Sequence, residues 1–335
     1  MNTEITNISY YLPPNSLTNQ DLSSLFEEKS EDEILQLFGV KKRSIRNPGQ
    51  IGSDLAFEAA EKLFQENKSI SKNSIDFLIF CTEGLDYKAP TSSSVLHYKL
   101  GLSENCGCID LPMGCSGFVY GLSIADAMIQ SGNATNILFL VADIPTSVIH
   151  STDFEMRCIF GDAGVAILIS SCTEKKIGKF IFGNDGTGAK NLIVERGTTR
   201  SPIDQQWLEL YKDEPEHLSH GRMQMNGLEI ARFSLQRVPS LLENTLKKNN
   251  ITFDDVDLFI FHQASKFILN ALQRKCKIPS EKFYTYYEEI GNTVSCSIPI
   301  ALKHAELDGK LKKGNKVMLL GFGVGYSWGG TIITW

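Results

Sequence analysis

The stretch "DVDLFIFHQAS", residues 255–265, decides the fold, because "SIDFLIFCTEG" at residues 74–84 repeats its pattern. Each stretch places an acidic residue before a short apolar run, which is typical of a strand buried on both faces. An amphipathic segment precedes each run: "LAFEAAEKLFQENKSI" the first and "FSLQRVPSLLENTLKKNNI" the second. The repetition predicts two similar halves, each with helices and strands.

A second pair of strands lies at matching distances from the first pair. These strands are predicted in "NATNILFLVAD" and "KKGNKVMLLGFG". Asp76 and Ile137 are 61 residues apart, and Asp257 and Val317 are 60 apart. The matched spacing favours a duplicated β-α-β unit over chance similarity between amphipathic segments. Helices that alternate with buried strands predict α/β layers, whose ligands bind beyond the carboxyl ends of the strands.

The composition of the chain limits the classes of partner that we expect. The 335 residues are 42% hydrophobic and 21% charged with a net charge of −6, which favours neither nucleic acid nor a membrane surface as partner. "MNTEITNISYYLPPN" lacks the features of a signal peptide, and no apolar run approaches the roughly 20 residues of a membrane span, so we expect a cytoplasmic protein. Its eight cysteines are then reduced thiols. Cys106 and Cys108 fit no usual zinc spacing, and no metal site is expected.

Cys115 in "DLPMGCSGFVYGL" lies between two glycines before a predicted helix over residues 116–131. One face of that helix is apolar, with Phe118, Leu122, Ala125 and Ile129. Free amides and the dipole at a helix N-terminus favour an anion, so we expect a lowered pKa for Cys115. Its own amide could donate to a developing oxyanion. The alternative is a buried structural cysteine.

Two further residues could act together with a thiolate in catalysis. His262 follows a predicted buried strand, and Asn292 lies in the predicted turn of "EIGNTVSCSIPIAL". An imidazole and a carboxamide can both direct N–H donors at a thioester carbonyl, which stabilises the enolate left when CO2 departs. The alternatives are a hydrogen-bonded core histidine and a turn or N-cap asparagine.

Five motifs in order resemble the β-ketoacyl-acyl carrier protein synthase III enzymes of the thiolase superfamily. They are "GCSGFVYGL", "IFGDAGVAIL", "FHQAS", "GNTVSCSIPIAL" and "GFGVGYSWGG". The resemblance implies a five-layer αβαβα fold of two similar halves, for which we expect boundaries of 1–172 and 173–335. It also implies a homodimer without a permanently bound cofactor.

The resemblance assigns roles to residues. It implies that Cys115 accepts the acyl group from a coenzyme A or phosphopantetheine thioester, and that His262 and Asn292 serve decarboxylation and condensation. It implies a second oxyanion donor near Gly323 and Val324, beside the amide of Cys115. The implied reaction joins the acyl group to malonyl-acyl carrier protein and yields a 3-oxoacyl product.

Three positions depart from the family pattern. Ser265 stands where the family's His-Gln-Ala-Asn motif ends in asparagine. Glu33 falls near the place of a tryptophan that stacks on the coenzyme A adenine in the family, which favours a carrier-bound acyl donor as an alternative to acyl-CoA. Ala89 precedes Pro90 where some members have a bulky residue, which predicts a roomier pocket and an acyl chain longer than acetyl.

Glu83 is a further candidate, as an acid/base group. It follows a predicted strand in "CTEG", which is similar to the pattern that places a catalytic glutamate in hydroxymethylglutaryl-CoA synthases of the same superfamily. A glutamate near a thiolate in a closed site could have a raised pKa and move protons. The alternative is a loop glutamate that faces solvent.

An acidic carrier protein requires basic docking residues. The candidates are Lys266, Arg274 and Lys275 after His262; two further groups are Lys41, Lys42 and Arg43, and Lys247 and Lys248. Besides the condensing enzyme, the sequence leaves open a hydroxymethylglutaryl-CoA synthase-like condensation, a non-condensing acyltransferase or thioesterase, and a non-catalytic dimer partner.

Overall fold

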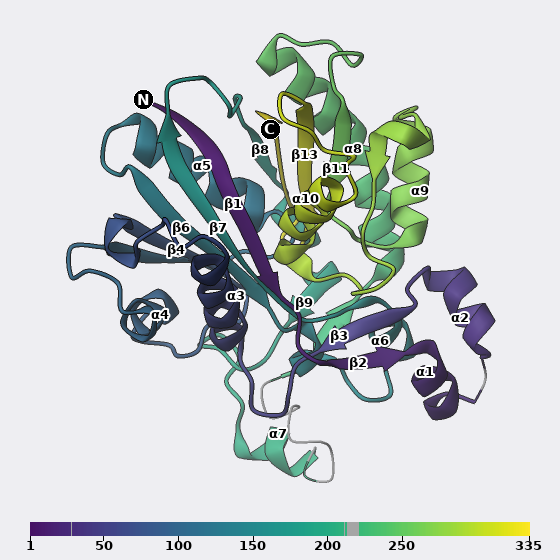
Figure 1. The fold of residues 1–335 in the computed structure, drawn as a ribbon. Coiled ribbons are helices and arrows are strands. Elements are labelled where there is room, and N and C mark those ends of the chain that lie inside the picture. The colour runs from purple at the N-terminus through teal and green to yellow at the C-terminus, as the bar shows by residue number, and fades with distance from the viewer. Residues whose placement is uncertain (28, 211, 213–220) are drawn as a thin grey trace.

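Two five-stranded sheets form the centre of the molecule. The computed structural model describes residues 1–27, 29–210, 212 and 221–335 (Figure 1). The first sheet has the order β1 (Asn2–Tyr11), β7 (Ala163–Cys172), β6 (Asn136–Asp143), β4 (Phe77–Cys81) and β5 (Gly107–Leu111). The second has the order β12 (Phe283–Tyr284), β11 (Leu258–Phe261), β13 (Lys316–Gly323), β14 (Ser327–Thr334) and β8 (Ile181–Asn184).

The two sheets repeat one another strand by strand. In the first, β4 pairs in parallel with β5 and β6, and β6 pairs antiparallel with β7. In the second, β11 pairs in parallel with β12 and β13, and β13 pairs antiparallel with β14. Asp76 accepts from the amide of Asn136 at 2.9 Å, as Asp257 does from that of Lys316 at 2.8 Å. The predicted repeat is confirmed. β7 ends at Cys172, and the boundary between residues 172 and 173 stays a prediction.

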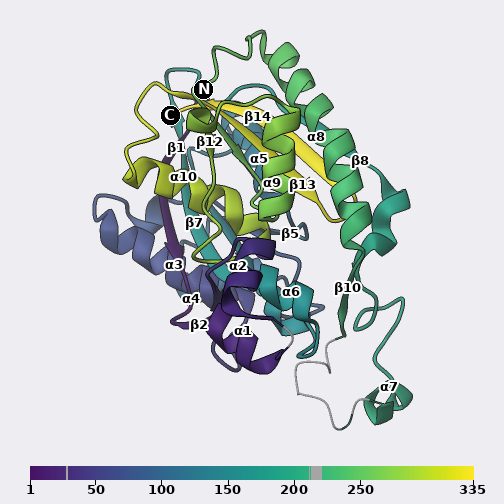
Figure 2. The ribbon, with the colours of Figure 1, turned by 90° about the vertical axis from the view of Figure 1, so that its right-hand side faces the viewer.

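Helices make three layers around the two sheets. Between the sheets lie α5 (Gly117–Gln130) and α10 (Ser297–Leu307), in one core with the inner sheet faces. The outer face of the first sheet is covered by α3 (Gly52–Glu66) and α4 (Ser92–Leu100), and that of the second by α8 (Gly227–Asn249) and α9 (Lys266–Lys275) (Figures 1 and 2). The predicted five-layer αβαβα architecture is confirmed.

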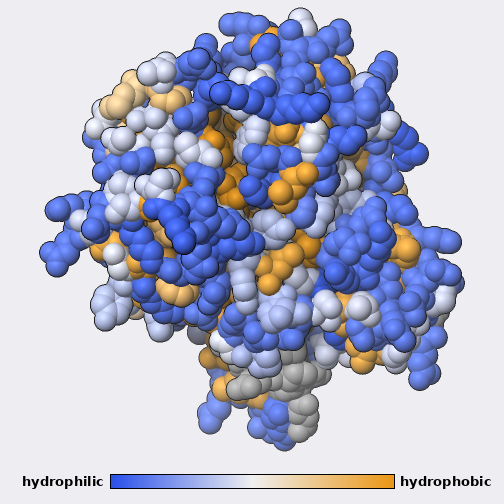
Figure 3. Space-filling model, viewed as in Figure 1, coloured by the Kyte–Doolittle hydropathy of each residue, from blue (hydrophilic) through white to orange (hydrophobic). Residues whose placement is uncertain are grey.

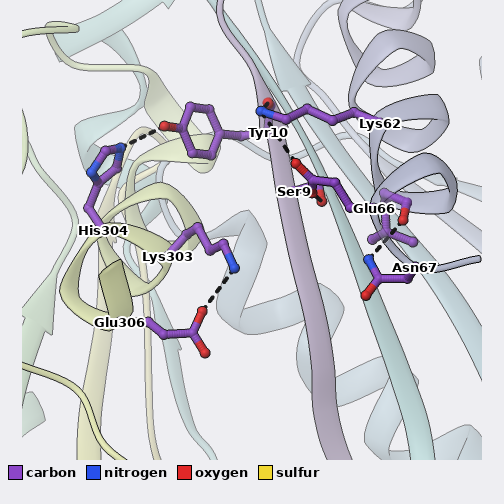
Figure 4. A network of polar contacts seen from close by, with 9 residues as sticks. Ser9, Tyr10, Lys62, Glu66, Asn67, Lys303, His304 and Glu306 are labelled. Carbon is purple, nitrogen blue, oxygen red and sulfur yellow. Dashed lines mark hydrogen bonds and ion pairs between the residues drawn. The ribbon is translucent and has the colours of Figure 1, made fainter. Parts of the chain in front are cut away.

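Side chains of β1 join two of these helix layers. Successive strand residues point to opposite faces of a sheet. Ser9 accordingly donates to Glu66 of α3, whereas the hydroxyl of Tyr10 lies 2.7 Å from Nε2 of His304 on α10 (Figure 4). The first sheet is therefore tied to its outer and inner helices by adjacent residues.

Smaller elements surround the layers. A hairpin of β2 (Asn15–Thr18) and β3 (Lys42–Ile45) carries α1 (Asn19–Leu25) and α2 (Glu31–Phe38), and α6 (Phe154–Ile159) packs beside them. A ribbon of β9 (Leu192–Val194) and β10 (Met223–Met225) leads to α7 (Gln205–Leu210), which extends away from both sheets (Figures 1 and 2). Short 3-10 turns complete the described chain: Lys72–Ser74, Pro145–Val148, Gly186–Asn191, Ser280–Lys282 and Val294–Cys296.

The surface agrees with the charged composition. On the face drawn in Figure 3, hydrophilic residues prevail and apolar residues form small separated areas. Among the helices described here, none combines the length and apolar character that crossing a bilayer requires.

Candidate active site

Cys115 lies at the start of α5, enclosed by a strand of the other sheet. The cysteine is 5% exposed. A Cβ atom at Gly323 of β13 would lie 2.7 Å from its Sγ, and one at Gly321 would lie 2.9 Å from Cα of Ser116, so glycine is required for this close approach. The predicted apolar face of the helix is buried throughout, which fixes α5 between the sheets.

Two opposing influences act on the pKa of Cys115. The backbone amides of Val324 and of the cysteine itself lower the pKa. Burial, followed by the negative charge of Glu83, raises it by more, so the net pKa lies well above that of an ordinary thiol. The expected lowering by the helix N-terminus is therefore wrong, because loss of hydration outweighs the amides. The resting cysteine is a thiol.

His262 follows β11 and is buried as a neutral ring. Its amide donates to Leu320 at 2.8 Å, and its Nδ1 lies 2.8 Å from Oγ of Ser297. Phe322 packs edge-on against the imidazole, with ring centroids 5.7 Å apart. Burial lowers the pKa of His262 to about 3, with only partial opposition from a hydrogen bond to the backbone of Val294. The imidazole is uncharged at neutral pH and can donate from one nitrogen only.

The side chain of Asn292 forms hydrogen bonds to two backbone segments. Its Nδ2 donates to the carbonyl of Ala264 at 3.1 Å, and its Oδ1 accepts from the amide of Val294 at 2.9 Å. The preceding Gly291 has φ +76, and a Cβ atom there would lie 2.7 Å from the carbonyl oxygen of Ile159, so the turn requires glycine. The turn covers residues 288–290, just before the predicted place, because Asn292 itself forms a β-bridge with Phe160. Asn292 does not cap α10 either, because Cys296 occupies that N-cap.

These three residues converge through shared neighbours. Val294 hydrogen-bonds with both His262 and Asn292, and it belongs to the same buried apolar cluster as Cys115. Phe322, which packs on His262, directly precedes Gly323, which touches Cys115. The site therefore joins the N-terminus of α5, the end of β11 and the turn before α10, with residues from both halves.

A pair of carboxyl groups lies beside Cys115. Glu83 is exposed as a residue in the isolated chain, but its carboxyl carbon would lie 2.5 Å from a Cβ atom at Gly114, so this group points at the cysteine loop. Asp143, at the end of β6, is 3% exposed and accepts from the amide of Glu83 at 2.9 Å and from the amide and hydroxyl of Ser295. Loss of hydration, then the charge of Asp143, raises the pKa of Glu83. The carboxyl group therefore lies against the cysteine loop, and the acid/base role of Glu83 stays a prediction.

Two kinds of residue in this site could not be singled out from the sequence. The position of Asp143 at the end of a predicted strand marked it as a possible site residue, but nothing in the sequence indicated that it contacts Glu83. No sequence pattern indicated the apolar wall around Cys115. It consists of Ile149, Met156, Phe160, Met223 and Val294, with Val148, Ile159, Leu192, Met225 and Val324 against them. Ala89 lies exposed on the β4–α4 loop and is not part of this wall, so its role in the acyl pocket stays a prediction.

The positions that depart from the family pattern have local structural roles. Ser265 is the N-cap of α9 and accepts from the amide of Ile268 at 3.4 Å. Glu33 belongs to the capping box of α2, in which its carboxylate accepts from the amide of Ser30 at 2.8 Å. This hydrogen bond, followed by one from the Ser30 hydroxyl, holds the pKa of Glu33 below its usual value.

The basic candidates differ in accessibility. Arg274 and Lys275 are exposed in the last turn of α9, whereas Lys266 is partly buried over Gly39. Arg43 is completely buried and donates to the carbonyl of Cys158, so the prediction that it belongs to a docking surface is wrong. The other candidates are exposed: Lys41 and Lys42, both paired with glutamates, and Lys247 and Lys248 at the end of α8.

Within the described ranges, no cluster of side chains could hold a metal ion.

Comparisons with known proteins agree on one family. A family model described as 3-oxoacyl-[acyl-carrier-protein (ACP)] synthase III matches residues 109–186, and the model of its C-terminal part matches residues 246–335. The β-ketoacyl-[acyl-carrier-protein] synthase III of Koribacter versatilis is 31% identical over 335 residues, which cover 99% of this chain and 97% of that protein. The corresponding protein of Ehrlichia canis is 33% identical over 331 residues, which cover 98% of each chain.

Solved structures give the same result. A 3-oxoacyl-(acyl-carrier-protein) synthase III superposes with a TM-score of 0.94 at 38% identity, over 100% of both chains. A 3-oxoacyl-(acyl-carrier protein) synthase from Burkholderia xenovorans LB400 superposes with a TM-score of 0.89 at 31% identity, over 100% of this chain and 94% of that one. The similarity therefore extends over both halves and the site between them.

Proposed function

Because the chain belongs to the 3-oxoacyl-[acyl-carrier-protein] synthase III family, we propose that it condenses an acyl group held on Cys115 with a malonyl group on an acyl carrier protein. CO2 leaves, and a 3-oxoacyl thioester is the product. The observation that carries the assignment of Cys115 is the close approach of β13: a Cβ atom at Gly323 would lie 2.7 Å from the buried sulfur, and the amides of Val324 and of Cys115 itself lower the pKa of that sulfur. Once the sulfur is acylated, the same donors can bind the thioester oxygen.

The first stage is acyl transfer to the thiol. Sγ of Cys115 attacks the carbonyl of an acyl thioester, the two amides stabilise the tetrahedral oxyanion, and the departing thiolate takes up the proton that Cys115 loses. Glu83 is the candidate for moving this proton, because its carboxyl group lies against Gly114 and has a raised pKa. Asp143 supports that role, since its negative charge opposes the ionisation of Glu83.

The second stage is decarboxylation and carbon–carbon bond formation. The malonyl carboxylate leaves as CO2, and the enolate oxygen that forms accepts hydrogen bonds from His262 and Asn292. For His262 to donate from Nε2, its Nδ1 must accept from the hydroxyl of Ser297, which lies 2.8 Å away. The enolate carbon then attacks the acyl-Cys115 carbonyl, and the cysteine leaves as a thiolate that regains a proton. Its relatives' shared name favours this reaction over the hydroxymethylglutaryl-CoA synthase-like alternative.

The acyl group is accommodated by apolar, adaptable side chains. Met156 and Met223 contribute to the wall around Cys115, and methionine adapts its shape to different ligands. The wall supports an acyl chain longer than acetyl, each buried methylene of which contributes on the order of 0.8 kcal/mol. The donor is an acyl-CoA or an acyl group on a carrier protein, and no resident cofactor takes part.

The partners follow from exposed features. An acidic carrier protein docks on the exposed Arg274 and Lys275 of α9, with the partly buried Lys266 at the other end of this helix, four residues after His262. A second copy of the chain pairs with β5, the edge strand of the first sheet, on which Ile109 is 45% exposed. The enzyme works in the cytoplasm as a homodimer.

Release of labelled CO2 from carboxyl-labelled malonyl-carrier protein tests the reaction, with medium-chain acyl thioester as donor. We expect His262→Ala and Asn292→Ala to keep the acyl adduct on Cys115 but to lose at least about a hundredfold in CO2 release. His97→Ala, on α4, is the control and should behave as the wild type. Rapid release of free acid without a 3-oxoacyl product would instead identify a thioesterase.

A further inference from the structure

Ser116 occupies the N-cap of α5 without capping it. Serine is among the most favoured N-cap residues, because its hydroxyl accepts from a free amide of the first turn. Here the Ser116 side chain makes no such bond. Its Oγ instead lies 2.7 Å from Oγ of Ser327, which is 211 positions away in the sequence. Both serines are buried, at 0% and 4% exposure.

The number of hydroxyl protons decides which serine is the donor in this hydrogen bond. Ser327 Oγ donates to the carbonyl of Val324 at 2.8 Å. A hydroxyl has one proton to donate, so Ser116 must be the donor to Ser327. The result is a chain of two hydroxyls that runs from the residue after the nucleophile to the carbonyl of Val324. The amide of the same Val324 follows Gly323, whose Cβ atom would lie 2.7 Å from the sulfur of Cys115, and it lowers the pKa of that sulfur.

The segment that the hydroxyls hold is the turn of the β13–β14 hairpin. Gly323 and Ser327 face one another as the last pair of the ladder, so Val324 lies in the three-residue turn between them. On the far side, Tyr326 secures the turn: its hydroxyl accepts from Asn191 at 2.8 Å, and its ring stacks on Phe233 with centroids 4.0 Å apart. The serine chain acts on the side that faces Cys115.

We propose that Ser116 and Ser327 are positioning residues that direct the N–H of Val324 at the thioester oxygen of acyl-Cys115. The inference rests on the proposed function, because it requires an acyl group on Cys115. Neither serine touches the reacting atoms. Without the hydroxyl chain, Tyr326 keeps the turn in place, but the carbonyl of Val324 is no longer held, so the backbone of Val324 can turn and its N–H can point away from the oxygen.

Infrared spectroscopy of the acyl-enzyme tests this directly. A donor that points at the thioester oxygen lowers the stretching frequency of the carbonyl. The protein is acylated with a thioester whose carbonyl carbon is carbon-13, in the absence of malonyl substrate. Ser327→Ala removes the hydroxyl, and Ser327→Thr retains one. Ser234→Ala is the matched control, because Ser234 is also buried and donates to a backbone carbonyl, that of Ile230 at 2.8 Å, away from the site.

We expect Ser327→Ala to raise the carbonyl frequency and to lower kcat at least about tenfold, less than the loss of a whole oxyanion donor. KM for the malonyl-carrier protein should not change, and Ser327→Thr should restore both the frequency and kcat. Ser116→Ala removes the bond that orients the Ser327 hydroxyl and should shift the frequency in the same direction by a smaller amount, so a Ser327 variant that fails to fold does not end the test.

Two negative results have different meanings. If the wild type forms an acyl adduct and both serine variants match Ser234→Ala in frequency and kcat, the positioning role is refuted while the proposed function stands. If the wild type forms no adduct on Cys115, the proposed function itself fails.

Discussion

At the scale of single residues, the site balances burial against hydrogen bonding. Burial and Glu83 raise the pKa of Cys115, and two backbone amides lower it by less. A thiol protected in this way must lose its proton during acyl transfer and regain it after condensation. Glu83 is suited to this exchange, since loss of hydration at its carboxyl group, which lies against Gly114, and the charge of Asp143 raise its own pKa to about 8.

Replacement of Glu83 by glutamine should change the reactivity of Cys115 in a pH-dependent manner. A carboxyl group carries charge only above its pKa, and the charge of Glu83 disfavours the thiolate. We therefore expect Glu83→Gln and the wild type to be alkylated by iodoacetamide at similar rates at about pH 6.5, and the variant to react faster above about pH 8. Peptide mapping with Cys115→Ala as reference separates this cysteine from the other seven of the eight. A rate ratio that is constant with pH would refute the coupling.

The identity of the candidate catalytic residues was predictable from the sequence, because short motifs surround them. Cys115 lies before a predicted helix, His262 follows a predicted strand and Asn292 lies in a predicted turn, but each also had a structural alternative, and the five family motifs were needed to assign their roles. The pKa of Cys115 was not predictable, because it depends on how deeply the folded chain buries the sulfur. The contact between Ser116 and Ser327 could not be predicted either, since 211 residues separate the two serines.

At the scale of elements, close packing of α5 against β6 fixes the position of the nucleophile. Phe118 of the helix and Phe139 of the strand stack with ring centroids 6.0 Å apart. Gly121 leaves room for the same phenylalanine, because a Cβ atom there would lie 2.1 Å from Cζ of Phe139. The helix that carries Cys115 at its start can therefore lie close to the sheet.

Substitution of Gly121 by alanine should destabilise the protein. The added methyl group overpacks the contact with Phe139, which typically costs about 1–3 kcal/mol, more than the gain in helix propensity. Thermal unfolding should show a lower Tm. Gly227→Ala at the start of α8 is the control, because a Cβ atom there meets open space. An unchanged Tm for the Gly121 variant would show that the packing is loose.

The last turn of α9 should determine affinity for the carrier protein. Arg274 and Lys275 are exposed there and can face an acidic partner. Joint charge reversal, Arg274→Glu with Lys275→Glu, should raise KM for malonyl-carrier protein about tenfold or more and leave KM for a free malonyl thioester unchanged, since each reversed charge replaces attraction by repulsion. Steady-state kinetics with both substrates measures this. Equal effects on the two would place docking elsewhere.

Periodicity predicted the long elements well. The apolar runs that became β4, β6, β11 and β13, and the amphipathic segments that became α3 and α8, follow directly from the order of apolar residues. The ribbon of β9 and β10 did not, because strands of three residues carry no readable period. The part of the apolar wall around Cys115 that lies on this ribbon therefore could not be predicted from the sequence.

At the scale of the whole molecule, duplication places one site between two halves. The first half supplies Cys115, and the second supplies His262 and Asn292. This arrangement follows from the repeat, because equivalent strand ends of the two sheets meet at α5 and α10. The fold and the convergence of the site were predictable from the repeat, whereas the exposed edge of the first sheet was not.

That edge leads to a prediction about assembly. An exposed edge strand offers unpaired backbone groups to a second chain. Ile109 on β5 is 45% exposed, and Tyr98 on the adjacent α4 is 85% exposed. We expect the wild type to have the mass of a dimer by light scattering and Ile109→Lys to shift it toward the monomer. Val194→Lys, an exposed apolar position on β9, is the control. A monomeric wild type would refute the homodimer.

The central claim is that Cys115 carries the acyl group. Intact-mass spectrometry after incubation with an acyl thioester tests it most directly. The account predicts a mass increase of one acyl group in the wild type, none in Cys115→Ala, and discharge of the adduct on addition of malonyl-carrier protein with formation of the 3-oxoacyl product. An adduct that persists in Cys115→Ala, or a wild type that remains unmodified, would contradict it.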